Sequence, residues 1–220
     1  MHIPDGFLDV KTAATAAVVS AVAISYSIKQ TREVLDDRQI PMMGVAAAFI
    51  FAAQMVNFPV AGGTSGHLIG GTLAAITFGP WAAMLIMSAV LIIQSFVFQD
   101  GGISALGGNI LLMAVVAPLV GYFVYSLLMG SGESRKRVLA STFVAGWIST
   151  ISASLVCAIL LSISNIVSIQ VAVPAMLGWH TLIGIGEGLV TAFVVSYLTK
   201  VKPGMVRRYR VNTKESVGAM

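Results

Sequence analysis

Long apolar runs, separated by short polar stretches, dominate the pattern of hydrophobic and polar positions along this chain. A helix that crosses a membrane needs about 20 predominantly apolar residues, because the hydrocarbon core is about 30 Å thick. The pattern therefore predicts an all-α, polytopic membrane protein. The apolar runs cover residues 12–28, 40–58, 68–98, 107–129, 138–162 and 171–199.

The third run is longer than one span requires and is interrupted by Gly79 and Pro80. Proline lacks a backbone N–H and fits best in the first turn of a helix, so this pair predicts that one helix ends and another begins there. The first arm of the resulting hairpin is too short for a full span at a rise of about 1.5 Å per residue. We therefore expect a short or partly re-entrant helix that other parts of the protein cover.

The basic residues give a separate argument for the hairpin. Twelve of the 13 Lys and Arg residues lie in three clusters, at residues 29–38, 135–137 and 200–214. The positive-inside rule places all three in the cytoplasm, so an even number of crossings must separate the first cluster from the second. Counting the hairpin as two crossings gives about seven transmembrane helices, with the amino terminus outside and the carboxyl terminus in the cytoplasm.

Composition supports this class and limits the partners. Apolar residues make up 57% of the chain and charged residues only 10%, against roughly 25% in a typical soluble domain. The net charge of +4 is carried by clusters beside apolar runs, as in proteins anchored against anionic lipid, so we expect no nucleic-acid partner. We expect one transmembrane substrate-binding domain over residues 1–220, with an external segment at 1–11 and a basic cytoplasmic tail at 200–220.

The amino terminus does not resemble a signal peptide. Asp5 and Asp9 precede Lys11 in the first eleven residues, whereas a signal peptide begins with a positively charged region. We therefore expect the first apolar run to be retained, with Met1 at the amino terminus. In this topology the amino terminus faces outward together with residues 59–67, 99–108 and 165–174.

The position of His2 suggests a metal site. The α-amine of Met1, the amide nitrogen of His2 and its imidazole Nδ1 can close a five-membered and a six-membered chelate ring if the amide loses its proton. Such a planar set of nitrogens suits Ni²⁺ or Cu²⁺ better than Zn²⁺. A fourth nitrogen is available from His67, which ends a glycine-rich outward loop at residues 62–67.

These two segments carry a family resemblance. The opening MHIPDGFL and the motif GGTSGHL at residues 62–68 closely resemble the cobalt/nickel substrate-specific components of energy-coupling-factor transporters, the CbiM/NikM family, and most of all NikM. The resemblance implies that the amino-terminal segment tucks into the bundle and that Met1, His2 and His67 hold the metal. Ni²⁺ or Co²⁺ would be the transported substrate, with no cofactor, in the inner membrane of a prokaryotic cell.

The resemblance also implies partners. Such a subunit works with a transmembrane coupling component and a pair of ATPases, and this chain has no GxxxxGK[ST] phosphate-binding loop of its own. Whether a small additional membrane subunit is needed stays open. Ala13, Ala17 and Ala21 form a small-residue face that suits close helix contact, either with the coupling component or within the bundle.

Other polar residues have less certain roles. His180 and Glu187 share a helical face but lie about 10 Å apart along the axis, so they cannot both bind one metal ion. We interpret them as a hydrogen-bonded histidine and a glutamate packed inside the bundle. Polar groups near the outer face are expected to orient the histidines or the terminal segment; the candidates are Asn57, Ser65, Gln94, Gln99, Asp100 and Asn109.

Two rival functions use some of the same residues. An intramembrane serine protease would pair Ser65 of Gly63-Thr64-Ser65-Gly66 with His180, but it gives no role to the amino terminus. A proton-coupled secondary metal transporter would normally need several intramembrane acids, whereas the predicted spans contain only Glu187. The sequence therefore favours a transport subunit that is not itself an enzyme.

Overall fold

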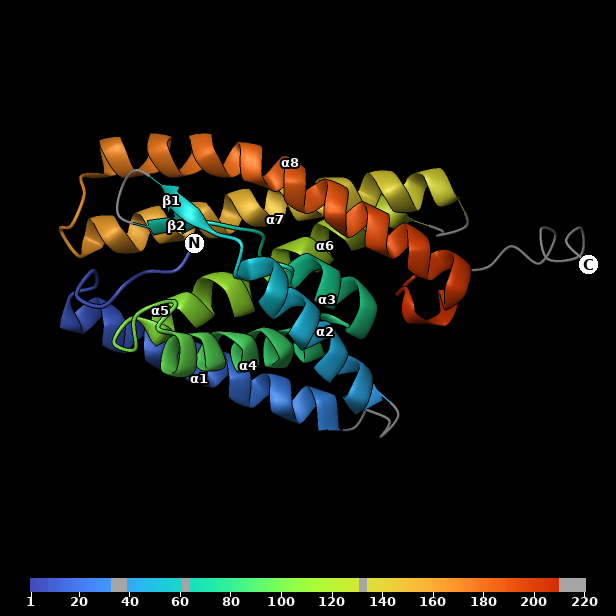
Figure 1. The fold of residues 1–220 in the computed structure, drawn as a ribbon, viewed down its shortest axis with the longest axis horizontal. Helices are drawn as coiled ribbons and strands as arrows, with labels where there is room; N and C mark the ends of the chain where they lie inside the picture. Colours follow the sequence, from blue (N-terminus) through green and yellow to red (C-terminus); the bar gives the residue numbers. More distant parts are fainter. Residues whose placement is uncertain (33–38, 61–63, 131–133, 210–220) are drawn as a thin grey trace, which may run out of the picture.

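The apolar runs fold into long helices that lie side by side along the longest axis of the molecule (Figure 1). The computed structural model describes residues 1–32, 39–60, 64–130 and 134–209. A π-helical stretch, Ile110–Val116, joins α5 (Leu106–Asn109) to α6 (Ala117–Met129) without a break. The helices are α1 (Val10–Arg32), α2 (Gln39–Gln54), α3 (Gly71–Phe78), α4 (Pro80–Phe98), α5 (Leu106–Asn109), α6 (Ala117–Met129), α7 (Arg135–Ile163) and α8 (Ile169–Val201).

The prediction of an all-α, polytopic membrane protein is confirmed. Within the described residues, five helical segments are long and apolar enough to cross a membrane: α1, α4, the continuous segment from α5 to α6, α7 and α8. The helix α2 is apolar but shorter, with 16 residues. Together with the eight residues of α3, these segments make up the seven helices expected from the sequence.

The predicted hairpin lies where the sequence placed it. Gly79 has a φ of 91°, which ends α3, and Pro80 begins α4 in the first helical position. All eight residues of α3 are buried, so the short first arm is covered by protein, as expected. Close contact with α6 is possible because Gly121 has no side chain; a Cβ there would overlap the side chain of Thr72.

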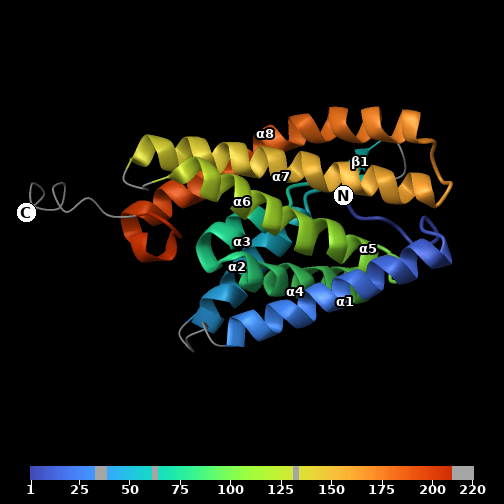
Figure 2. The ribbon, with the colours of Figure 1, turned by 180° about the vertical axis from the view of Figure 1, so that it is seen from behind.

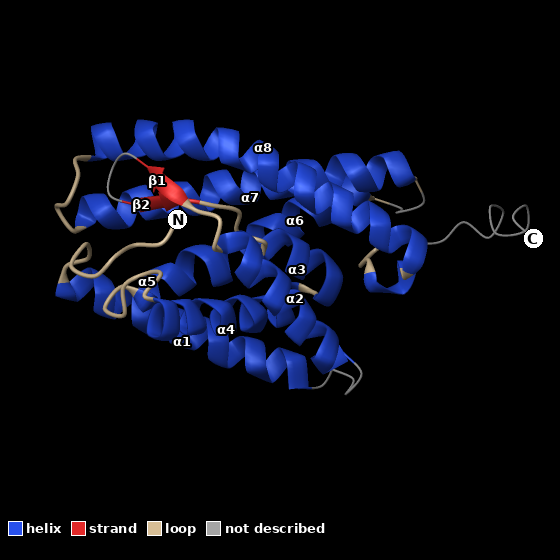
Figure 3. Ribbon diagram, viewed as in Figure 1, coloured by secondary structure: helices blue, strands red, loops and turns tan. Residues whose placement is uncertain are grey.

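One local feature differs from the sequence-based expectation. The outward loop contains a small antiparallel pair of strands, β1 (Phe58–Val60) and β2 (Thr64–Gly66), drawn red in Figure 3. Residues 62 and 63 of the predicted glycine-rich loop lie outside the described residues. At the same end of the bundle, residues 169–174 belong to α8, with Pro174 inside the helix. This proline is tolerated because the missing hydrogen bond falls near the amino-terminal end of the helix.

The two ends of the bundle have different chemistry. The last turn of α1, the beginning of α7 and the end of α8 lie at the same end, as both opposite views show (Figures 1 and 2). These elements carry Lys29 and Arg32, the basic residues 135–137, and Lys200. The positive-inside rule makes this the cytoplasmic end. The loop between α7 and α8 and the beginning of α1 lie at the opposite end.

The first part of the predicted cytoplasmic tail packs against the bundle. After α8, a short 3₁₀ turn, η2 (Pro203–Met205), leads the chain back, and Val206 is buried. The buried Tyr125 of α6 donates a hydrogen bond to the carbonyl oxygen of Arg207 at 2.8 Å. The backbone N–H of Arg207 donates to the carbonyl of Ile76 in α3 at 3.0 Å. Val206 and Arg207 of the predicted tail therefore contact the bundle.

Candidate metal-binding site

The amino terminus lies inside the bundle, close to β2 and α5 (Figure 1). The side chains of Met1 and Ile3 are 0% exposed, and that of His2 is 4% exposed. Burial of a methionine or isoleucine side chain contributes roughly 1.5–3 kcal/mol each. These two apolar side chains therefore anchor the segment on either side of His2 and hold the histidine in the interior.

Hydrogen bonds fix the depth of this segment. The side-chain oxygen of Asn109 accepts from the N–H of Ile3 at 2.8 Å, and the Asn109 amide donates back to the carbonyl of Ile3 at 3.1 Å. The N–H of Gly102 donates to the same carbonyl at 2.9 Å. The backbone of Ile3 is thus satisfied in the interior, where an unpaired polar group would be costly.

The loop after α4 has no room for a side chain where the amino-terminal segment crosses it. A Cβ atom at Gly102 would overlap the backbone of Pro4 and Asp5, so only glycine permits this approach. Beyond the crossing, Asp5 accepts hydrogen bonds from both the N–H and the hydroxyl of Ser104, which lower the pKa of its carboxyl. Asp5 therefore fastens the segment to this loop at the surface.

The imidazole rings of His2 and His67 lie against each other, with centroids 4.6 Å apart and planes inclined by 23°. Nε2 of His2 donates to the side-chain oxygen of Gln94 at 3.1 Å, so its neutral ring keeps a lone pair on Nδ1. Nδ1 of His67 donates to the carbonyl of Leu68 at 2.7 Å, which leaves the lone pair on Nε2. That Nε2 is buried and has no hydrogen-bond partner among the described residues.

Ser65 brings the main-chain nitrogens to the same place. Its hydroxyl oxygen lies 3.2 Å from the α-amine of Met1 and 3.2 Å from the amide nitrogen of His2. Asp100 lies on the other side, with a carboxylate oxygen 3.3 Å from Nδ1 of His2. The amine, the amide and both imidazoles therefore meet in one buried region, next to a single carboxylate.

Burial keeps the candidate donors uncharged at neutral pH. It lowers the pKa of the Met1 amine from 8.0 to about 4 and that of His2 from 6.5 to about 3. It also lowers the pKa of His67 well below 6.5, and the nearby amine adds to this shift. Burial raises the pKa of Asp100. Neutral nitrogen donors in a desolvated place are what a transition-metal ion requires.

The other residues singled out in the sequence lie at different distances from this region. The Asn57 amide nitrogen approaches Asp100 at 3.5 Å, and Asn109 holds Ile3. Gln99 ends α4 with a φ of 55° and has no described hydrogen bond to either histidine. Within the described residues, no three His, Cys, Asp or Glu side chains are grouped to hold a metal ion.

His180 and Glu187 lie in α8, and both are buried. Nδ1 of His180 donates to the carbonyl of Met176 in the same helix at 2.8 Å, a contact that agrees with the interpretation as a hydrogen-bonded histidine. Glu187 accepts hydrogen bonds from the backbone just after His67, a contact that sequence reasoning missed. Its only signal in the sequence was an acidic residue in an otherwise apolar span.

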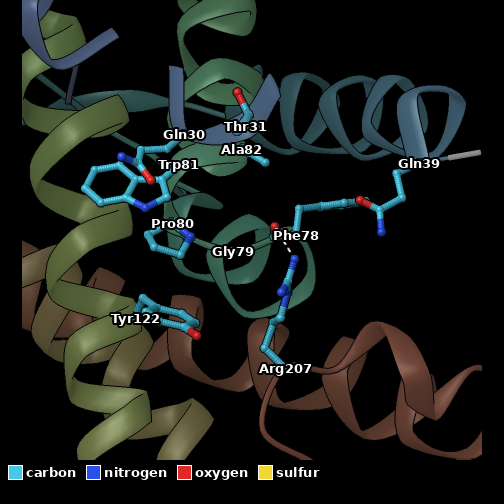
Figure 4. Close-up of a pocket in the computed structure, with 10 residues that line it drawn as sticks. All are labelled: Gln30, Thr31, Gln39, Phe78, Gly79, Pro80, Trp81, Ala82, Tyr122 and Arg207. Atoms are coloured by element: carbon cyan, nitrogen blue, oxygen red, sulfur yellow. Dashed lines mark hydrogen bonds between the residues drawn. The ribbon is translucent and has the colours of Figure 1, made fainter. Parts of the chain in front are cut away.

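A separate cavity of about 260 Å³ opens at the cytoplasmic end, beside the turn between α3 and α4 (Figure 4). Trp81 and Tyr122 line one side of it, and Arg207 reaches in from the carboxyl-terminal segment. The guanidinium of Arg207 donates to the carbonyl of Phe78 at 3.1 Å. This cavity contains none of the candidate metal donors.

Comparison with known proteins identifies the family. Residues 2–205 match the CbiM family, described as the cobalt uptake substrate-specific transmembrane region. The chain belongs to this family. A protein of Archaeoglobus fulgidus, provisionally named a fused nickel transport protein NikMN, is 42% identical over 210 residues, which cover 94% of this chain and 68% of that protein. The fused nickel transport protein NikMN of Rhodobacter capsulatus is 34% identical and is covered to 64% of its length.

A solved structure has the same fold. The crystal structure of a truncated transition metal transporter superposes with a TM-score of 0.86 at 35% identity, covering 91% of this chain and 99% of that one. Family and fold together make this chain a multi-pass membrane component of metal transport and not an enzyme. The protease interpretation is therefore wrong, and the metal is a transported substrate and not a cofactor.

Proposed function

We propose that this protein captures Ni²⁺ or Co²⁺ at the outer face of the membrane and holds it with four nitrogen donors. These are the α-amine of Met1, the amide and imidazole Nδ1 of His2, and Nε2 of His67. The observation that carries the proposal is the meeting of these nitrogens in one buried region, where the hydrogen bond from Nδ1 of His67 leaves the lone pair on its Nε2. Residues 1–11 would be the external metal-binding segment.

The arrangement of donors favours a planar site. Three of the four nitrogens belong to one short stretch of chain, which would close two fused chelate rings around the ion. Among divalent ions, Ni²⁺ prefers such a square-planar nitrogen set more strongly than Co²⁺. A deprotonated amide of His2 would supply negative charge close to the ion, and Asp100, 3.3 Å from the ring of His2, would supply more.

The remaining polar neighbours would act around the donors. The oxygens of Gln94 and Leu68 each accept a hydrogen bond from one imidazole and so set which ring nitrogen faces the metal. The hydroxyl of Ser65 can turn to donate to the amide nitrogen once that nitrogen has lost its proton. Asn57 would hold the carboxylate of Asp100.

A titration of the purified protein with Ni²⁺ and with Co²⁺, followed by visible absorption, tests this site. We expect stoichiometric Ni²⁺ binding with the yellow colour of planar, diamagnetic nickel, and loss of that species in His2→Ala and His67→Ala. His180→Ala is the matched control, because that ring bonds within its own helix. A green, paramagnetic octahedral complex in the wild type would contradict the planar site.

The energy for uptake would come from other polypeptides. We propose a transmembrane coupling component and a pair of ATPases as partners, because this sequence has no phosphate-binding loop for ATP. The outer side of α1 supports a docking role: Thr12, Ala16 and Ser20 face the bundle, whereas Ala17 and Ala21 are exposed. The fused names of the longer relatives are consistent with a further membrane subunit.

Uptake into vesicles tests the partnership. We expect ATP-dependent accumulation of ⁶³Ni²⁺ only when the coupling component and ATPases are reconstituted with this chain. Bulky substitution at the exposed face, Ala21→Trp, should reduce uptake and leave nickel binding unchanged. Accumulation driven by a pH gradient with this chain alone would instead establish the proton-coupled mechanism.

A further inference from the structure

Glu187 reaches from α8 to the chain that immediately follows His67. Its two carboxylate oxygens accept hydrogen bonds from the backbone N–H groups of Ile69 and Gly70, each at 2.8 Å. The glutamate is only 3% exposed and lies 117 residues or more from these partners in the sequence. A buried acidic side chain with both oxygens occupied in this way is a specific tertiary contact and not general packing.

The contact falls at the positive end of a helix. Gly70, with a φ of 80°, is the N-cap of α3, and because it has no side chain it provides no side-chain cap. The free N–H groups at the start of a helix carry partial positive charge and need acceptors. Glu187 supplies a negative acceptor from another helix, so the start of α3 and the middle of α8 are fastened to each other.

The same short stretch is held from a second side. The side-chain amide of the buried Gln54, the last residue of α2, donates to the carbonyl of Ile69 at 2.6 Å. One residue earlier, the carbonyl of Leu68 accepts a hydrogen bond from Nδ1 of His67. The backbone that sets the ring orientation of His67 is thus fixed within two residues by Glu187 and Gln54.

We propose that Glu187 is a positioning residue for the metal site, which fixes the backbone after His67 and thereby aims Nε2 of that histidine at the metal ion. The inference rests on the proposed role of His67 as a ligand. Glu187 itself does not bind the ion, because both of its oxygens are taken by N–H groups. On this proposal, the buried Glu187 of α8 has a structural role in metal capture and not a role in proton transfer.

The substitution Glu187→Gln separates this role from packing. Glutamine has nearly the same shape but only one acceptor oxygen, so its NH₂ group would face one of the two N–H donors. Loss of such an outer-shell contact typically weakens metal binding 10- to 100-fold. We expect a loss of this size for Ni²⁺, together with a change in the visible spectrum of the bound ion as His67 is replaced in part by water.

A matched control is Ser149→Ala. Ser149 is also buried in a long helix and donates an interhelical hydrogen bond, to the carbonyl of Ala117 at 2.8 Å, but it has no described contact with the metal region. It should keep the wild-type nickel affinity and spectrum. A spectrum normalised per bound Ni²⁺ does not change when a variant simply yields less folded protein, so it reports on ligand geometry.

The outcomes distinguish the inference from the proposed function. If His67→Ala also retains nickel binding, the proposed ligand set fails. If His67→Ala loses binding but Glu187→Gln keeps the wild-type affinity and spectrum, only the positioning role is overturned; the same holds if Ser149→Ala shows an equal loss. Should Glu187→Gln not fold, Glu187→Asp carries the test, because it keeps the charge but is one methylene too short, and wild-type behaviour there also refutes the role.

Discussion

Acetylation of the α-amine of Met1 is expected to abolish high-affinity nickel binding, although every histidine is retained. The amine would become an amide, which is no longer basic and binds a metal ion only after it loses its proton. Extension of the amino terminus by a single alanine removes the same amine but moves His2 to position three. The new amine, two amides and the imidazole of His2 could then bind Ni²⁺ without His67, so extension is expected to change the ligand set and acetylation to abolish binding.

The structure indicates how an extended chain responds. The segment could slide outward to restore an amine near the site, but this would expose the buried side chains of Met1 and Ile3 and break the hydrogen bonds that Ile3 makes with Asn109 and Gly102. At roughly 1.5–3 kcal/mol for each side chain and about 1 kcal/mol for each hydrogen bond, sliding costs on the order of 5 kcal/mol or more. The segment should therefore stay in register and lose the donor.

The loss should exceed the 10- to 100-fold effect typical of residues that only support a ligand, because a ligand itself is removed. Competition between the purified protein and a chelator of known nickel affinity measures it, with the mass of the amino terminus checked first. The same alanine added after Met220 is the control, since it leaves the amine intact. Undiminished affinity in the acetylated protein would refute the proposed coordination, even if His2 and His67 proved essential.

Two further predictions concern the docking of the amino-terminal segment. Nickel affinity should fall between pH 8 and pH 5.5. The pKa of the Met1 amine is 8.0 in a released segment and about 4 when it is docked, and that of His2 is 6.5 and about 3, so protons favour release as the pH falls. A constant affinity in equilibrium dialysis across this range would contradict this. Gly102→Ala should weaken nickel binding roughly tenfold or more by pushing Pro4 and Asp5 outward, whereas Gly44→Ala, where the new methyl group meets nothing, should not.

The sequence alone was sufficient for the class of the protein and for most helix positions. Span length depends on the thickness of the bilayer, and the break at Gly79 and Pro80 depends on backbone chemistry within two residues, so both can be predicted locally. The metal-site hypothesis also came from local information, since the amine, amide and imidazole that chelate one ion belong to Met1 and His2. It stays a prediction until metal binding is measured.

Other features required the tertiary structure. The packing of residues 203–209 depends on contacts with α3 and α6, which no local pattern in the sequence reveals. The partners of the site were likewise undetermined: a buried polar side chain must find an acceptor or donor, but the sequence does not say which one. Only the folded chain brings Asn109 to Ile3 and Glu187 to Ile69, because these residues are far apart in the sequence and meet through tertiary packing and not through any local pattern.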